Sequence, residues 1–419
     1  MRTYIPRFAD NILKKEGEAF GAVLITGPKW CGKTTTGLHL AKSALFMQDP
    51  DERSQNLQLA DLKPSRLLEG ETPRLIDEWQ DAPQLWDAVR FSVDKRGETG
   101  LYILTGSTHV DESLIAHSGT GRISRLRMRT MSLYESGDSN GTVSLSDLLQ
   151  DKEISGKSSH SITDVAELMV GGGWPGSVGK SLSIKQRQVA GYCQSIVNTE
   201  ISTADGVSRD SEKVFQVLRS YSRHISTQAT IKTITGDVSQ KFDSISRKTV
   251  GEYLEALQKI FVIEELPAWA PALRSKTSIS TTSTRHFVDP AIAAYFLDAN
   301  AEDLLNDLET MGLLFESMVI RDLRIYTESL DGKVFHYRDH SGQEADAILH
   351  FRNGKWAAIE VKLGNKAIEN GAASLLKLAE KVDTDKMNPP AFLAVITGTG
   401  YAYQREDGVY VIPIGCLKN

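Results

Sequence analysis

The residues best suited to chemistry lie in the segment 27–34, which reads Gly-Pro-Lys-Trp-Cys-Gly-Lys-Thr. It matches the pattern G-x-x-x-x-G-K-[ST] of loops that bind the phosphates of a nucleotide. The β-prone apolar run 22–26 precedes it, and a helical pattern follows. Glycines let backbone N–H groups turn inward around phosphates, and a helix start adds a favourable field. The sequence therefore predicts an ATP site; the alternative is a glycine-rich turn that only connects a strand to a helix.

Within this segment, two side chains are expected to perform the chemistry. The Lys33 ammonium would lie between the β- and γ-phosphates, and the Thr34 hydroxyl would complete the shell of a Mg²⁺ ion. Trp30 would either stack on the base or sugar or, as variable loop positions usually do, face outward. The residues predicted to contact the nucleotide are Gly27, Pro28, Lys29, Trp30, Cys31, Gly32, Lys33, Thr34 and Thr35, with Asp77 from a later strand.

Two adjacent acids, Asp77 and Glu78, come at the end of the short apolar run 74–77. A phosphate loop needs a second carboxylate to hold Mg²⁺, and we expect Asp77 to hold the metal through water. Glu78 would polarise the water that attacks the γ-phosphate. Considered alone, the pair fits a plain surface turn equally well. Its combination with the phosphate loop favours the catalytic interpretation.

Two further segments hold candidates for contact with the γ-phosphate. The run 101–105 ends at Thr105 and Ser107 follows, so either hydroxyl would lie between the two motifs. In segment 121–129, arginine alternates with Ile, Leu and Met, which predicts a strand with one polar face. Arg122 would reach the γ-phosphate in cis or from a neighbouring subunit, as an arginine finger does. The alternatives are an ordinary polar strand end and a solvated strand face.

In this order and spacing, the motifs resemble the AAA-type P-loop ATPase family whose members carry a C-terminal domain of unknown function numbered 4143. The resemblance covers nearly the whole chain, and it implies ATP at the phosphate loop. The region after Leu133 departs from the family pattern because no packed lid is evident, so no second sensor is assigned. The segments that carry the resemblance are Leu-Ile-Asp-Glu-Trp-Gln-Asp-Ala-Pro (75–83), Leu-Thr-Gly-Ser (104–107), Gly-Arg-Ile (121–123) and Gly-Gly-Trp-Pro (172–175).

The middle of the chain contains a candidate recognition helix, 246–257. A Ser N-cap precedes two basic residues, and Val250, Leu254 and Leu257 form an apolar stripe. The next run, 260–264, would form the wing of a winged helix, and the family resemblance agrees. Residues 209–276 carry 11 basic and 8 acidic residues, a surplus of only 3. Because each neutralised phosphate needs its own cation, contact with DNA and a purely structural role both stay open.

In the tail, Glu344-Ala345-Asp346 is followed by Glu360-Val361-Lys362 after an Asn-Gly turn. An antiparallel hairpin would bring Asp346 and Glu360 together to chelate Mg²⁺, with Lys362 on the same face as Glu360. Such a site hydrolyses phosphodiesters, and Glu316 on a preceding helix would add a ligand. The set resembles the D-…-E-x-K nuclease fold. The alternatives are a solvated charged hairpin and a nuclease fold without activity.

Length and composition place these motifs in a multidomain globular protein. The 419 residues predict two to four domains. The net charge of −6 excludes a protein that coats polyanions non-specifically. Three scattered cysteines predict a reducing compartment. The charged start and the lack of an apolar run of roughly 18 residues argue against a signal peptide and a membrane span. We expect a soluble, cytoplasmic protein of undetermined oligomeric state.

The predicted fold class is α/β in three parts. A P-loop NTPase domain with a parallel sheet (1–160) precedes a helical and winged-helix region (161–290) and a nuclease-like α/β domain (291–419). The predicted function is Mg²⁺-dependent ATP hydrolysis, with a tail and winged helix that engage DNA or RNA. The alternative is a nucleotide-gated binding module that carries a catalytically inactive nuclease fold.

Overall fold

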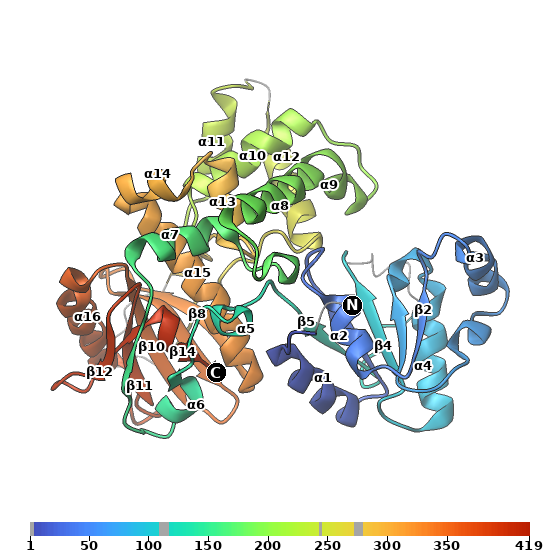
Figure 1. Ribbon diagram of the computed structural model, residues 1–419, viewed down its shortest axis with the longest axis horizontal. Coiled ribbons are helices and arrows are strands. Elements are labelled where there is room, and N and C mark those ends of the chain that lie inside the picture. The colour runs from blue at the N-terminus through green and yellow to red at the C-terminus, as the bar shows by residue number, and fades with distance from the viewer. Residues whose placement is uncertain (1–3, 109–116, 243–244, 272–279) are drawn as a thin grey trace. The chain divides into compact units, whose positions relative to one another are not determined.

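A computed structural model describes residues 4–108, 117–242, 245–271 and 280–419 (Figure 1). The chain divides into two compact units, called unit 1 and unit 2 below. Unit 1 comprises Met1–Thr130, Glu200–Ser208 and Ala256–Phe261. Unit 2 comprises Met131–Thr199, Arg209–Glu255 and Val262–Asn419.

Unit 1 is built on a five-stranded sheet in which every pair of neighbouring strands is parallel. The spatial order is β2-β3-β4-β1-β5, so β4 lies between β1 and β3. This confirms the predicted α/β architecture with a parallel sheet. The strands are β1 (Ala22–Thr26), β2 (Ser43–Phe46), β3 (Arg74–Asp77), β4 (Tyr102–Gly106) and β5 (Ile123–Arg127).

Helices cover both faces of this sheet because its central strands are apolar on both sides. Val23 and Ile25 of β1 pack in one cluster with Leu13 of α1. Ala22 and Leu24, which point the other way, belong to a cluster with Trp86, Val89 and Val93 of α4. A parallel sheet buried on both faces reads as a continuous apolar run, as 22–26 does. The helices are α1 (Phe8–Ala19), α2 (Lys33–Leu40), α3 (Arg53–Leu62) and α4 (Gln84–Arg96).

Unit 2 contains a mixed seven-stranded sheet in the order β7-β12-β13-β11-β10-β9-β8. The long helix α15 (Leu308–Ser329) contacts β8, β9 and β10, and α16 (Ile368–Lys381) contacts β9, β10 and β11. The strands are β7 (Gly156–Lys157), β8 (Gly332–Arg338), β9 (Glu344–Phe351), β10 (Trp356–Lys362), β11 (Phe392–Thr397), β12 (Tyr401–Gln404) and β13 (Tyr410–Pro413).

The segment after Thr130 belongs to unit 2 rather than to the nucleotide-binding sheet. β6 (Val143–Ser144) pairs with β14 (Leu417–Lys418), and β7 pairs with β12. The structure therefore leaves unit 1 earlier than the domain edge expected at residue 160. Strands of two residues are too short to produce a hydrophobic period, which is why this segment resembled a linker. The division into three functional domains stays a prediction.

Along the chain, helices dominate the stretch between β5 and β8. Three of them, α10, α11 and α12, follow one another, and α11 did not stand out in the sequence. The strand expected at 260–264 is reduced to a single antiparallel bridge between Ile263 and Phe287. The helices are α5 (Leu133–Ser136), α6 (Leu145–Leu148), α7 (Ile162–Gly171), α8 (Leu182–Ser195), α9 (Ile201–Thr203), α10 (Ser211–Arg223), α11 (Ile231–Ser239), α12 (Arg247–Lys259), α13 (Pro290–Phe296) and α14 (Ala301–Asn306), with a π-helical turn at Ile196–Glu200.

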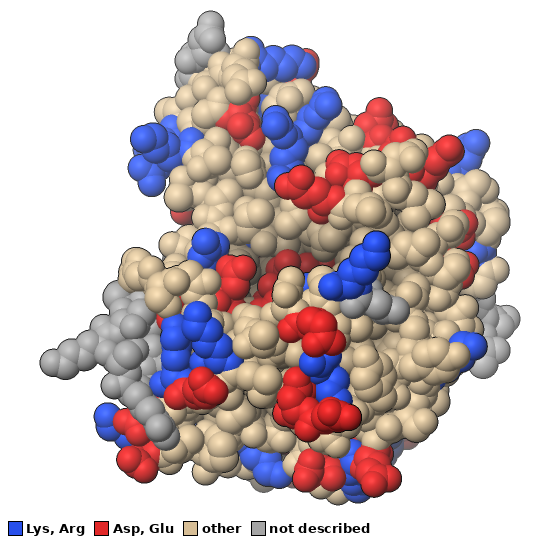
Figure 2. Space-filling view, turned by 90° about the vertical axis from the view of Figure 1, so that its left-hand side faces the viewer, with Lys and Arg blue, Asp and Glu red and all other residues tan. Residues whose placement is uncertain are grey.

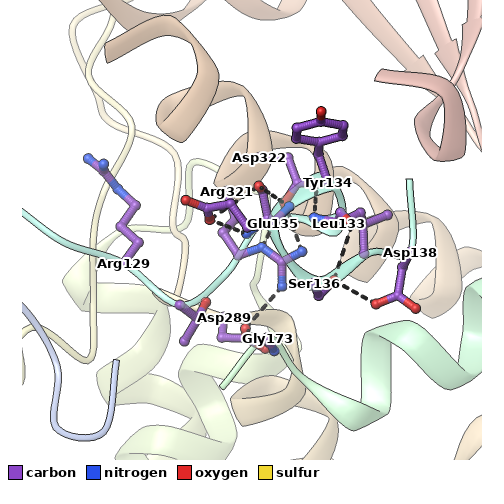
Figure 3. Close-up of polar contacts among 12 residues, drawn as sticks. Arg129, Leu133, Tyr134, Glu135, Ser136, Asp138, Gly173, Asp289, Arg321 and Asp322 are labelled. Atoms are coloured by element: carbon purple, nitrogen blue, oxygen red, sulfur yellow. Dashed lines mark hydrogen bonds and ion pairs between the residues drawn. The ribbon is translucent and has the colours of Figure 1, made fainter. Parts of the chain in front are cut away.

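A buried ion cluster holds the first residues of unit 2 in place (Figure 3). Arg321 of α15 lies 3.0 Å from Asp289 and 2.7 Å from Asp322, and all three side chains are almost fully buried. Asp322 accepts the backbone N–H of Leu133 at 2.9 Å, and Asp289 accepts that of Gly173, also at 2.9 Å. The cluster thus holds the start of α5 and the loop at Gly173 against α15.

Gly173 explains part of the Gly-Gly-Trp-Pro segment. Its carbonyl accepts the Met131 N–H at 2.6 Å, and a Cβ at this position would lie 2.3 Å from the Met131 carbonyl oxygen. Only glycine lets the two backbones approach so closely.

We predict that Arg321→Met destabilises the full chain by about 3–5 kcal/mol, because it leaves two buried carboxylates without their cation. Urea unfolding followed by circular dichroism measures this change. The control is Lys152→Met, which removes an exposed ion pair with Asp147. A loss of stability for Arg321→Met no larger than that of the control would contradict the interpretation.

Candidate functional site

The phosphate loop begins where β1 ends and runs into the start of α2. Gly27 and Gly32 have φ angles of +151° and +102°, which residues other than glycine rarely adopt. A Cβ on Gly27 would lie 2.2 Å from the carbonyl oxygen of Met128. The loop lies at the carboxyl ends of parallel strands, where open α/β sheets bind ligands. Both glycines of the motif are therefore required by the backbone itself.

Lys33 bends back over this loop. Its ammonium donates to the carbonyl oxygens of Gly27 at 3.0 Å and Pro28 at 2.9 Å, and the residue is only 5% exposed. These are two backbone carbonyls and no carboxylate, so the charge of the ammonium is not neutralised by them. A phosphate group fits this arrangement because it would supply the missing negative charge.

Asp77 at the end of β3 joins the loop to two strands. Its Oδ1 accepts a hydrogen bond from the Thr34 hydroxyl at 2.7 Å and another from the Thr105 hydroxyl at 2.5 Å. Mg²⁺ prefers oxygen ligands such as a hydroxyl and a carboxylate, and here the two oxygens lie 2.7 Å apart. Thr34 and Asp77 are therefore brought together as expected, and their chemistry fits the ion.

Glu78 lies in the left-handed region, with φ 52° and ψ 50°, which is uncommon outside glycine. Its backbone N–H donates to the Thr105 hydroxyl at 3.2 Å. Its Oε2 accepts hydrogen bonds from Ser107 at 3.1 Å and from the side-chain amide of Gln80. Thr105 and Ser107, expected between the two motifs, thus both bond the acids. Whether either hydroxyl also contacts a γ-phosphate stays a prediction.

Other residues of the loop differ in where their side chains lie. Trp30 is 62% exposed, whereas Cys31 is fully buried in the core of unit 1. Thr35 is exposed. The Lys29 ammonium lies 2.7 Å from Glu200, an acid that sequence reasoning did not single out. No local signal could have found it, because 171 positions separate the two residues.

Arg122 is not brought to the phosphate loop of its own chain. Its carbonyl accepts the N–H of Ala22, the first residue of β1, and its guanidinium bonds Asp94 at 2.7 Å. The loop lies at the other end of β1, about 16 Å away at about 3.3 Å per residue. The expectation of a contact in cis is therefore wrong, because Arg122 precedes β5 in a parallel sheet. A contact from a neighbouring subunit stays a prediction.

In unit 2, the antiparallel pair β9 and β10 brings the expected carboxylates together. The Lys362 ammonium lies 2.6 Å from Glu360 and 3.8 Å from Asp346. Asp346 also accepts the backbone N–H of Val361 at 2.7 Å, and Ser374 of α16 lies 3.4 Å from Glu360. The hairpin predicted from the Asn-Gly turn is thus present, and in it Lys362 contacts both Asp346 and Glu360.

Burial and neighbouring charges shift the pKa values of the ionisable groups in and around this carboxylate cluster. Burial, reinforced by the charge of Asp346, raises the pKa of Glu360 to about 8. Burial alone would lower the pKa of Lys362, but the charges of Asp346 and Glu360 raise it above its ordinary value. Loss of solvent raises the pKa of Glu316 on α15 well above its ordinary value, and Asp346 adds to this shift. The charges of the cluster thus influence Glu316, whereas its role as a metal ligand stays a prediction.

No group of three or more His, Cys, Asp or Glu side chains in the described part of the chain is arranged to hold a metal ion. Lys362 is the cation that Asp346 and Glu360 contact. The predicted ligand set of Asp346, Glu360 and Glu316 is therefore not assembled as a metal cage, and its role in holding Mg²⁺ stays a prediction.

We predict that Glu360→Gln becomes more stable relative to the parent as the pH rises from 5 to 9. Between the ordinary pKa of 4.5 and about 8, the folded state binds more protons at Glu360 than the unfolded state, so the free energy of unfolding falls with rising pH. Urea unfolding at both pH values, with a chelator present, measures the difference.

The control for this experiment is Glu369→Gln. Its hydrogen bond with Arg405 lowers the pKa of Glu369, so its contribution to stability is already complete at pH 5 and shows no trend up to pH 9. If Glu360→Gln also showed no trend, Glu360 would ionise as an ordinary exposed acid does.

Three family models match separate parts of the chain: an AAA domain at residues 19–136, a domain of unknown function (DUF8612) at 162–303 and a domain of unknown function (DUF4143) at 311–417. No curated protein matches the chain. A Walker-type ATPase, PABY2304 of Pyrococcus abyssi, is similar in structure with 14% sequence identity and a TM-score of 0.43, covering 70% of this chain and 96% of that one.

The AAA match supports ATP binding and hydrolysis by unit 1. In the described residues, no helix is both long and apolar enough to cross a membrane. The order of the matched domains agrees with the resemblance found in the sequence. The matches therefore support an AAA-type ATPase with a C-terminal domain of unknown function 4143.

Proposed function

We propose that unit 1 is a Mg²⁺-dependent ATPase that uses Lys33, Thr34, Asp77 and Glu78. The observation that carries this proposal is the 2.7 Å contact between Thr34 and Asp77, together with the Lys33 ammonium, which only backbone carbonyls hold among the described residues. Mg²⁺ held by Thr34 and Asp77 would neutralise part of the charge of the phosphates. The phosphate-loop amides and Lys33 would bind the triphosphate.

In the proposed reaction, the oxygen of a water attacks the γ-phosphorus and the bond to the bridging oxygen of ADP breaks. Glu78 takes the proton that the water loses. Lys33 exchanges the carbonyl oxygens of Gly27 and Pro28 for phosphate oxygens, so its charge is already in place when the transition state forms. Arg122 would take part only by reaching the ATP site of a neighbouring subunit, which requires that the protein forms an oligomer.

We predict that Lys33→Ala lowers kcat/KM for ATP about 100-fold or more while the fold is retained, because one preorganised charge is lost. Steady-state turnover and circular dichroism measure the two effects. The control is Lys42→Ala, an exposed lysine of the same unit. Parental turnover in Lys33→Ala would refute the assignment of the loop.

We further propose that the tail engages nucleic acid through the face of β9 and β10 that carries Asp346, Glu360 and Lys362. Two acids and an ammonium in contact at strand ends are the groups that phosphodiester hydrolysis uses. Burial raises the pKa of Glu360 to about 8, and a divalent cation bound there would favour the ionised form that burial penalises.

A second contact with nucleic acid would come from α12. Three consecutive helices, α10 to α12, followed by the bridge between Ile263 and Phe287, support a winged-helix module. Arg247 and Lys248 at the start of α12 are exposed. Figure 2 shows basic and acidic side chains interspersed on the viewed face, which favours local contacts over a long basic track.

The alternative is a nucleotide-gated binding module whose tail no longer cleaves. The salt bridge of Lys362 with Glu360, at 2.6 Å, favours this alternative, because the ammonium already satisfies a carboxylate that a metal would need. Both versions share the ATP site and differ only in the chemistry of the tail.

We predict that the protein with Mg²⁺ or Mn²⁺ cleaves DNA or RNA and that Asp346→Asn abolishes cleavage without loss of fold, since a metal ligand is removed. Gel analysis of labelled single- and double-stranded substrates measures this. The control is Glu380→Gln, an exposed acid on α16.

Retention of intact nucleic acid that depends on ATP would favour the binding module instead. In that case, replacing both Arg247 and Lys248 by alanine tests whether α12 makes the contact. If the protein neither cleaved nor bound nucleic acid, the nucleic-acid proposal would be refuted.

A further inference from the structure

Gln80 stands out among the residues around Glu78. It lies in the 3-10 turn Trp79–Asp81 that directly follows Glu78. The left-handed backbone of Glu78 turns the chain so that the side chain two positions later returns to the acid. Its amide nitrogen donates to Glu78 Oε2. This orientation of the amide follows from the chemistry, because an ionised carboxylate only accepts hydrogen bonds.

The other end of the amide is unusual. Gln80 Oε1 is buried, and among the described residues it has no hydrogen-bond partner. A buried carbonyl oxygen without a donor costs about 1–3 kcal/mol, so such an atom calls for an explanation. A water molecule is the simplest group that would satisfy it.

Gly106 shows that space is kept for this amide. A Cβ on Gly106 of β4 would lie 3.0 Å from Gln80 Oε1 and 3.2 Å from the Trp79 indole nitrogen. Glycine inside a strand weakens it, and its presence often marks a close approach by another group. Here the group that approaches is the side chain of Gln80, which explains the glycine of the Leu-Thr-Gly-Ser segment.

Only one oxygen of the Glu78 carboxylate is hydrogen-bonded to the described residues. Its Oε2 accepts from Ser107 and Gln80, while Oε1 has no hydrogen-bond partner among the residues described. The carboxylate therefore has one oxygen without a partner among the described residues, and the amide that holds its other oxygen has an unpartnered oxygen of its own.

We propose that Gln80 is a positioning residue for the water that attacks ATP, an inference that rests on the proposed ATPase function. Its nitrogen fixes the Glu78 carboxylate, and its oxygen accepts one hydrogen of the water. The other hydrogen passes to Glu78 Oε1 as the water oxygen bonds to the γ-phosphorus and ADP leaves. Orientation of this kind lowers the barrier without tighter binding of ATP.

The test compares Gln80→Met, which keeps the length of the side chain but removes both polar groups, with Gln84→Met, an exposed glutamine of the same unit. We expect Gln80→Met to lower kcat about 100-fold, by analogy with other groups that assist proton transfer, and to leave KM within a factor of two to three. Gln84→Met is expected to match the parent in both constants.

Binding provides a readout that does not depend on turnover. We expect calorimetry to show unchanged affinity of Gln80→Met for ADP with Mg²⁺, but affinity about 100-fold weaker for ADP with aluminium fluoride, which mimics the phosphoryl group and its attacking water. Equal losses for both ligands, or a rise in KM with kcat unchanged, would overturn the proposal, because Gln80 would then support binding alone.

If Gln80→Met fails to fold, Gly106→Ala serves as the second variant. It keeps the glutamine but pushes its amide oxygen away from a Cβ at 3.0 Å. The same selective loss of affinity for the aluminium fluoride complex is expected, and parental behaviour would count against the proposal. Failure of the ATPase proposal is distinguishable, because the parent would then bind neither nucleotide and Glu78→Gln would change nothing.

Discussion

Unit 1 depends on one constraint: three neighbouring strand ends must place their polar groups around a single carboxylate oxygen. Asp77 Oδ1 accepts from Thr34, which follows β1, and from Thr105 of β4. Because β4 lies between β1 and β3, the bond from Thr34 spans the strand that separates the loop from the acids. The parallel register, in which Thr26 and Gly106 are paired at the ends of β1 and β4, brings these groups to one edge.

Unit 2 places carboxylates at strand ends under a different balance of forces. Neutral hydroxyls satisfy Asp77, whereas the ammonium of Lys362 contacts both Asp346 and Glu360. The burial that raises the pKa of Glu360 would make two uncompensated acids costly. The Lys362 ammonium offsets part of the cost of burying these acids. It also contacts the carboxylates that a metal would need.

Local sequence patterns are informative for some elements of this chain and not for others. The run 22–26 became a strand with those bounds, because buried strands of a covered sheet are continuously apolar. Arg122 failed as a contact in cis, because spacing along the chain does not say at which end of a sheet a residue lies. The strand expected at 260–264 failed as well: a short apolar run is equally suited to a buried loop, and only one bridge forms at Ile263.

From its sequence alone, the chain specified the phosphate loop, the acids that follow β3 and the hairpin that carries Asp346 and Glu360. Glycine at a left-handed or crowded position and an Asn-Gly turn act within a few residues, so they can be read locally. The partners of these groups were decided only by the tertiary structure. Lys29 meets Glu200 and β7 joins β12 across long stretches of chain, because packing of the whole core, rather than local propensity, selects which distant segments come together.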